Sequence, residues 1–224
     1  KDDGTGGALA SRFWVTPALE GAPLPVCEGG YVLPPFPYPL DSDPSEFPIR
    51  VDADSLAHAL RGNTTLEGAV TLSQGNRRIT GRQGALDREG GEGRLVGQVS
   101  ILEPGLVLEG EQVRIDLDSR AASLEGVQFL LPALSLRGQA ASIERASDGR
   151  LLVRDGRLTR CEPGNRAWRL DVGELSLAPN DVFATARDAT VRVGDFPVLY
   201  TPYLRFPVRP DRQSGVLFPD IGFS

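Results

Sequence analysis

Few residues in this chain have the types and spacing that catalysis or metal binding requires. His58 is the single histidine, so every Ser-His-Asp or Cys-His arrangement would depend on it, and no nucleophile motif accompanies it. One histidine and two cysteines also nearly exclude a four-ligand zinc site, which draws mostly on those residue types. We therefore expect no catalytic residue, no cofactor and no metal ion.

Two pairs of carboxylates are spaced so that both members share one face of a strand: Asp52 with Asp54, and Asp116 with Asp118. Such pairs serve acid–base chemistry or bind calcium. Neither pair has the loop glycine and the further oxygen ligands of a calcium site, so solvent-facing alternation is the better interpretation. A phosphate loop is followed by a lysine and a helix, and the glycine-rich run 89–93 is followed by neither. We predict that this run is a flexible hairpin.

The two cysteines, Cys27 and Cys161, are 134 positions apart. From spacing alone, three states remain open: a disulfide between them, two free buried thiols, or bonds to a part of the chain that is not present. High β-content with few cysteines indicates, weakly, an exported bacterial protein.

Composition limits the classes of protein further. The 224 residues are 40% hydrophobic, enough for one globular domain with an appendage. The formal net charge of −6 argues against a nucleic-acid-binding surface. No run of 18 apolar residues is present, so we expect no transmembrane helix. With no initiator methionine and no signal-peptide pattern, we interpret the chain as a mature or excised segment.

Alternation of apolar and polar residues predicts an all-β chain. Runs such as 69–72, 113–117 and 190–193 place apolar side chains at every second position, on one face of a half-buried strand. The best helix candidate, Asp54–Leu60, is one or two turns long at most, and Gly62 prevents it from continuing.

A repeat underlies these strands. Two series of glycines recur at intervals of 28 to 30 residues: Gly68, Gly97, Gly126 and Gly156, and then Gly81, Gly110 and Gly138. Each unit holds two strands of about ten residues in which the glycines mark bends or bulges. The repeat predicts an antiparallel β-jellyroll, an open roll of roughly nine to eleven strands built from stacked two-stranded units. A parallel β-helix is the competing geometry.

The ends of the chain differ from the repeats. Residues 1–48 contain nine prolines from Pro17 onward and are predicted to be an extended arm rather than a packed sheet. Residues 49–200 form the predicted roll. The segment after it, 201–224, is apolar, aromatic and interrupted by proline.

The interior of the predicted roll is aliphatic. Thirteen inward positions would line it: Val70, Leu72, Leu95, Val99, Ile101, Leu108, Val113, Ile115, Leu124, Phe129, Leu131, Leu136 and Ile143. A self-filled core and a groove for an acyl chain both need such residues, so periodicity cannot distinguish the two.

Several blocks resemble one family, the periplasmic domain of the lipopolysaccharide-assembly family LptD (OstA). They are residues 47–54, 72–76, 155–164 with Trp168, 186–190 continuing through 198–204, and 212–219. The last two blocks, Ala-Arg-Asp-Ala-Thr through Val-Leu-Tyr-Thr-Pro-Tyr-Leu and Arg-Gln-Ser-Gly-Val-Leu-Phe-Pro, are the most specific.

The resemblance implies a β-jellyroll followed by the first segment of an outer-membrane β-barrel, located at the periplasmic face of the outer membrane of a Gram-negative bacterium. It implies a non-enzymatic function. The roll would receive lipopolysaccharide, through the lipid A acyl chains, from the periplasmic bridge protein LptA and deliver it to the barrel. The plug lipoprotein LptE would contact the missing barrel. The alternative is a β-repeat polysaccharide-active enzyme or adhesin scaffold with a filled core.

The resemblance also implies roles for individual residues. Cys27 and Cys161 match two family cysteines that bond to cysteines of the C-terminal barrel region, absent here. Pro207 and Pro219 would weaken strand pairing where the barrel begins, at a lateral gate for lipid. A strand near Ile49–Asp54 would be an exposed edge that pairs with the bridge protein by β-augmentation.

Overall fold

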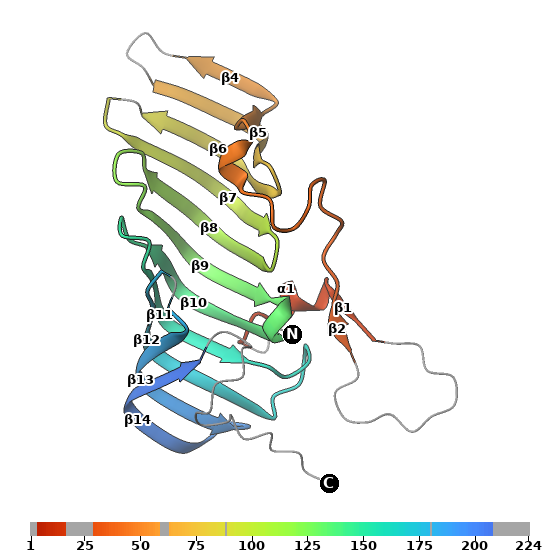
Figure 1. Ribbon diagram of the computed structural model, residues 1–224, viewed down its shortest axis with the longest axis vertical. Coiled ribbons are helices and arrows are strands. Elements are labelled where there is room, and N and C mark those ends of the chain that lie inside the picture. Colours follow the sequence, from red (N-terminus) through yellow and green to blue (C-terminus); the bar gives the residue numbers. More distant parts are fainter. Residues whose placement is uncertain (1–3, 17–28, 59–62, 88, 180, 208–224) are drawn as a thin grey trace.

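The computed structural model describes residues 4–16, 29–58, 63–87, 89–179 and 181–207, and in them one long antiparallel sheet dominates (Figure 1). Its strands are β3 (Arg50–Asp52), β4 (Ser55–His58), β5 (Asn63–Gln74), β6 (Arg77–Asp87), β7 (Glu92–Glu103), β8 (Leu106–Asp116), β9 (Ala122–Leu131), β10 (Leu136–Arg145), β11 (Leu151–Thr159), β12 (Trp168–Leu177), β13 (Phe183–Val193) and β14 (Phe196–Pro207). Two 3₁₀ turns, η1 (Pro44–Glu46) and η2 (Pro132–Leu134), complete this part.

Neighbours in sequence are neighbours in the sheet from β5 to β14, and every pairing in the described part of the chain is antiparallel. The predicted all-β antiparallel roll of two-stranded units is therefore confirmed, and the parallel β-helix is excluded. The sheet has twelve strands within the described ranges, slightly more than predicted, because its first edge is divided between β3 and β4, which both pair with β5.

The first glycine series lies where the long strands bend. Register shifts interrupt the pairing near Gly68 and Gly97, and both residues have left-handed backbone conformations, with φ of 94° and 83°. At the corresponding place in β11 the left-handed residue is Asp155 (φ 48°) rather than the expected Gly156. Aspartate tolerates this conformation better than most residues, so the repeat continues without a glycine there.

The helix predicted for Asp54–Leu60 is wrong for the residues described. Residues 55–58 form strand β4, in which Leu56 lies opposite Leu66 of β5. A free sheet edge offers backbone donors and acceptors to the adjacent segment, and this pairing prevails over a short helical pattern with little intrinsic stability.

The N-terminal arm is not simply extended. Helix α1 (Gly7–Ser11) lies against β9 and β10, and β1 (Trp14–Val15) pairs with β2 (Gly30–Tyr31) (Figure 1). Leu9 is 1% exposed and packs on Val107 and Leu130, opposite each other on β8 and β9. Val107 and Leu130 point to one face of the sheet, whereas their neighbours in sequence point to the other. The face with Val107 and Leu130 therefore also needs an apolar cover. The arm provides it.

A second attachment holds the arm at the β5–β6 turn. The buried Asn76 side chain accepts a hydrogen bond from the backbone N–H of Tyr38 (3.0 Å) and donates to the carbonyls of Tyr38 (3.0 Å) and Pro39 (2.8 Å). The Tyr38 and Phe47 rings stack beside it, with centroids 4.3 Å apart.

Replacing Asn76 with alanine should lower the free energy of unfolding by about 2 kcal/mol, because three backbone groups lose their partner at a buried position. Guanidinium denaturation of the purified chain measures this. Asn63→Ala, at an exposed position on β5, is the control and should change stability by less than about 0.5 kcal/mol. Equal effects of the two substitutions would contradict the role of Asn76.

Several predicted features lie outside the described residues: Cys27, Pro219 and residues 208–224. In the part of the chain that the structure covers, no helix combines the length and apolarity needed to cross a membrane.

Candidate functional site

Register places the inward side chains of the sheet in continuous rows that run perpendicular to the strands. The first row has one residue from each strand from β4 to β14: Leu56, Leu66, Gly84, Leu95, Val113, Leu124, Ile143, Val153, Leu175, Ala186 and Leu204. Every member is apolar or glycine. No single strand shows this row, which exists only because the register is kept from unit to unit.

The second row lies beyond the strand bends and runs from β3 to β14. Its members are Val51, Leu72, Ile79, Ile101, Leu108, Phe129, Gly138, Leu158, Leu170, Val191 and Leu199. This row too has no polar side chain. The two rows together form an apolar lining that extends from one edge of the sheet to the other.

Exposure changes along these rows. In the middle they are buried, as at Leu124 (3%) and Leu170 (1%). At the edges they are open to solvent: Val51 is 47% exposed, Leu56 65% and Leu199 58%. A core that is only structural would normally bury its apolar ends, because each exposed large side chain loses about 1.5–3 kcal/mol of transfer free energy.

All thirteen interior residues predicted from the sequence lie in or against two adjoining apolar clusters of this lining. The prediction missed the second half of the lining, which comprises Leu158, Leu170, Val172, Leu175, Ala186, Val191, Leu204 and Phe206. Alternation is present in those strands too, but alanine and polar residues interrupt it, so the signal per strand is weaker. Val107 and Leu130 were also missed as buried residues of the opposite face.

The outer face of the same strands is polar and cross-linked by ion pairs. Asp171 is the centre of one group, within 2.8 Å of Arg192 and 3.2 Å of Arg169. Arg154 lies between Glu144 (3.3 Å) and Glu174 (3.6 Å) in another. Pairs this exposed contribute little individually, and they hold long side chains on the solvent side of each strand.

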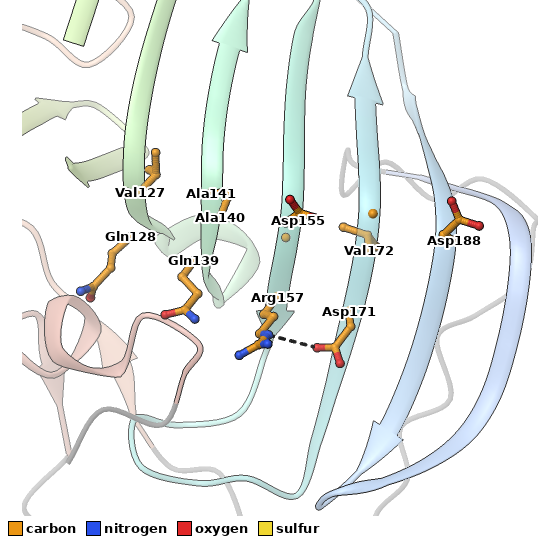
Figure 2. Close-up of a pocket in the computed structure, with 13 residues that line it drawn as sticks. Val127, Gln128, Gln139, Ala140, Ala141, Asp155, Arg157, Asp171, Val172 and Asp188 are labelled. Carbon is orange, nitrogen blue, oxygen red and sulfur yellow. Dashed lines mark ion pairs between the residues drawn. The ribbon is translucent and has the colours of Figure 1, made fainter. Parts of the chain in front are cut away.

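A hollow of about 610 Å³ lies on the outer face beside the arm (Figure 2). Gln128, Gln139, Arg157 and Asp171 are register neighbours along it, and the carboxylate of Asp171 is 4.0 Å from Arg157. The backbone N–H of Leu9 donates to Gln128 (3.3 Å), which attaches α1 to this row. The hollow therefore adjoins the face that binds the arm, and Val127 and Val172 of the two core clusters also border it.

The loop between β11 and β12, which contains Cys161, is held by one buried side chain. Arg137 is 0% exposed and donates to the carbonyls of Cys161 (2.9 Å), Glu162 (2.9 Å) and Asn165 (3.3 Å). It also donates to the carbonyl and hydroxyl oxygens of Thr5, at 3.0 and 2.6 Å. The arm and the Cys161 loop thus share one anchor.

The carboxylate pairs have local roles. Asp54 accepts a hydrogen bond from the backbone N–H of Ala69 (3.0 Å) beside the bend at Gly68. Asp116 accepts from the N–H groups of Ser119 (2.7 Å) and Asp118 (3.1 Å), and the backbone and hydroxyl bonds from Ser119 lower the pKa of Asp116. No group of three or more metal-ligating side chains occurs within the described ranges.

Within the described ranges, the sheet ends at β3 and β4 on one side and at β14 on the other. β3, which falls within the segment predicted to be an exposed edge, lies at one end of the sheet with all three residues exposed. β14 lies at the other end and carries five exposed apolar side chains, Phe196, Val198, Leu199, Tyr200 and Tyr203. The hydroxyl of Tyr200 donates to the carboxylate of Asp188 (2.9 Å), which raises the pKa of Tyr200.

The sequence of this chain is similar to that of one group of known proteins. The chain is 36% identical over 210 residues to the LPS-assembly protein LptD of Saccharophagus degradans, and 33% identical over 211 residues to LptD of Chromohalobacter salexigens. LptD of Pseudomonas savastanoi is 35% identical over 199 residues. This chain is homologous to part of LptD. The resemblance predicted from the sequence is confirmed.

The match covers 94% of this chain but 24% of the Saccharophagus LptD, so the chain spans about a quarter of the length of the LptD proteins it matches. No protein-family model matches it. A solved structure of LptH, described as the LptA homologous periplasmic component of the lipopolysaccharide transport device of Pseudomonas aeruginosa, is 15% identical. It covers 74% of this chain and 97% of its own length, with a TM-score of 0.28, too remote to add to the assignment.

Two residues singled out by the likeness to LptD are described. Among the described residues no disulfide partner faces Cys161, a half-buried thiol whose Sγ lies 3.8 Å from the carbonyl oxygen of Trp168. Pro207 is the last residue of β14, opposite Phe183. Their roles in LptD-type assembly stay predictions.

Proposed function

We propose that this chain is a non-enzymatic conduit for lipopolysaccharide, in which the two apolar rows hold the lipid A acyl chains. The observation that carries the proposal is the continuity of the rows across eleven strands together with their exposure at the edges. Each acyl CH₂ that leaves water gains about 0.8 kcal/mol, so a lipid crossing an aqueous compartment needs an uninterrupted apolar surface.

The proposal includes a direction of transfer. Lipid would enter at the β3 edge, where a bridge protein of the LptA type adds a strand and its apolar interior continues the rows. It would leave at the β14 edge, toward an outer-membrane barrel associated with LptE. Pro207 and Pro219 would form a weakly paired gate there. Cys27 and Cys161 would bond to cysteines of that barrel.

A crosslinking experiment on the purified chain tests the conduit. A photoreactive amino acid replaces either Ile79, an inward member of the second row, or Arg78, its exposed neighbour on the opposite face. Illumination with purified lipopolysaccharide should give an adduct at position 79 that is at least tenfold more abundant than at position 78. Lipopolysaccharide without acyl chains should not compete.

Adducts at neither position, in chain shown to be folded by circular dichroism, would contradict the conduit and favour a scaffold with a filled core. Equal adducts at both positions would mean non-specific adsorption and would also contradict it.

A further inference from the structure

Arg137 joins two segments that are far apart in the sequence, the arm and the Cys161 loop. A guanidinium group has five N–H donors, and in Arg137 each of them has an acceptor. The Nε donor and the two Nη2 donors bind carbonyls of the Cys161 loop, and the two Nη1 donors bind the carbonyl and hydroxyl oxygens of Thr5. The side chain is 0% exposed, so the guanidinium group is closed off from water while the arm and the loop are both in place.

Opening of the Cys161 loop therefore has a different cost in the two states of the arm. With the arm docked, an open loop would leave three N–H donors of a buried cation without acceptors, and an uncompensated buried charge is strongly destabilising. With the arm undocked, water reaches the guanidinium group of Arg137 and satisfies the same donors. Because both events depend on one buried group, docking of the arm and closure of the loop favour each other, and this coupling is reciprocal.

The arm makes a close backbone contact with β10 beside Arg137. Gly6 has a left-handed backbone conformation, with φ of 70°, and lies so near the strand that a Cβ there would be 2.3 Å from the carbonyl oxygen of Gly138. Three residues further along, the buried side chain of Leu9 anchors α1 on the sheet. Docking of the arm can therefore be disturbed at Gly6 or Leu9 without any change to Arg137, to the loop or to the thiol.

The backbone of Cys161 is fixed on both sides of its thiol while the loop is closed. Its N–H donates to the hydroxyl of Thr159 (3.1 Å), which is itself buried, and its carbonyl accepts the Nε donor of Arg137 (2.9 Å). The side chain is half-buried in this state. Opening of the loop releases the second of these bonds, so we expect it to expose the thiol.

We infer that the arm is a latch on the Cys161 loop and that Arg137 carries the coupling between them. The docked arm keeps the loop closed and protects the thiol, and release of the arm makes the thiol accessible. This inference goes beyond the proposed conduit, since neither the lipid nor the apolar rows take part in it. If Cys161 bonds to a cysteine outside this chain, as the likeness to LptD implies, docking of the arm would determine when that cysteine can reach it.

The test measures the rate at which a maleimide labels Cys161 in the purified chain without denaturant. Every variant also carries Cys27→Ser, so that Cys161 is the single thiol. Gly6→Ala should raise the labelling rate at least tenfold, because the added Cβ displaces the arm from β10. Leu9→Ala, which removes the buried anchor of α1, should have a similar effect. Gly30→Ala lies in the same arm with no atom within 4 Å of its Cβ, and it should change the rate less than twofold.

Two further variants separate the latch from a general loss of stability. Asn76→Ala weakens the other attachment of the arm, at the β5–β6 turn, and should leave the labelling rate within twofold of the reference although it lowers stability. Arg137→Met should raise the labelling rate by itself. Adding Gly6→Ala to Arg137→Met should then raise the rate less than twofold further, because the group that couples the arm to the loop is gone.

Three results would overturn the inference. The first is an unchanged labelling rate in both Gly6→Ala and Leu9→Ala. The second is an equal rise in Gly6→Ala and Asn76→Ala, which would make labelling a measure of overall stability. The third is a double variant of Gly6 and Arg137 in which the two effects multiply, which would show that Arg137 does not couple the arm to the loop. Circular dichroism of each variant confirms that the sheet is retained, so a misfolded chain cannot imitate the expected result.

Discussion

Replacing Arg137 with methionine is expected to lower the free energy of unfolding by about 4 kcal/mol, a large part of the stability of a typical domain. Methionine occupies a similar volume but donates no hydrogen bond. Three loop carbonyls, including that of Cys161, and two oxygens of Thr5 would then lose a charged donor at a buried position. Each unsatisfied buried acceptor costs about 1–3 kcal/mol, partly relieved by water entering the site.

Guanidinium denaturation measures this loss, and the matched control is Arg160→Met, an exposed arginine in the same loop. The control should change stability by less than about 0.5 kcal/mol. The rate at which a maleimide reacts with Cys161 gives a local reading and should rise in the Arg137 variant well below the denaturation midpoint. A loss under about 1 kcal/mol would show that the loop and the arm are held by other contacts.

Replacing Gly138 with alanine should cost about 3 kcal/mol by overpacking. A Cβ at this position of β10 would lie 2.3 Å from the ring of Phe129 and 2.4 Å from the carbonyl oxygen of Arg157. The ring could turn aside only by moving within a buried row, and the carbonyl belongs to the adjacent strand. Backbone therefore has to shift, and such shifts spread through a close-packed sheet.

Gly30→Ala is the control for this substitution, because no atom lies within 4 Å of the corresponding Cβ. The difference in melting temperature between the two variants is the measurement, and we expect the Gly138 variant to melt at least 5 °C lower. Similar melting temperatures would mean that the sheet opens at β9–β11 more easily than its packing indicates.

The sheet could be predicted from the sequence because the residue pattern that specifies each strand is local. Alternation within a strand and glycines every 28 to 30 residues are both visible in one dimension, and they located the interior side chains of the first half of the lining and several of the bends. The Asp155 bend was not visible, since only the backbone conformation shows that aspartate replaces glycine there. The helix predicted at Asp54–Leu60 was wrong because pairing with residues of β5 that lie six to twelve positions further along the chain determines the state of that segment.

The N-terminal arm shows a different limit of prediction from sequence. Its prolines were interpreted as a sign of an extended segment, but Leu9 is among the most buried residues of the chain. One signal could have indicated its docking: residues 106–108 and 129–131 are unbroken apolar triplets, so these strands need cover on both faces. Arg137 offered no signal at all, since a buried arginine satisfied by carbonyls depends on a loop 24 residues away and on the first residues of the arm.

The repeat of 29 residues has a consequence for the dimensions of the apolar rows. Each unit contributes two strands, and adjacent strands are about 4.8 Å apart, so one unit lengthens the lining by about 10 Å and leaves its cross-section unchanged. The length of the lining is therefore set by the number of whole repeat units. Insertion or deletion of one whole unit would change the distance between the two edges of the sheet by a fixed amount. Insertion or deletion of a single residue within a strand would instead break the register on which every row depends.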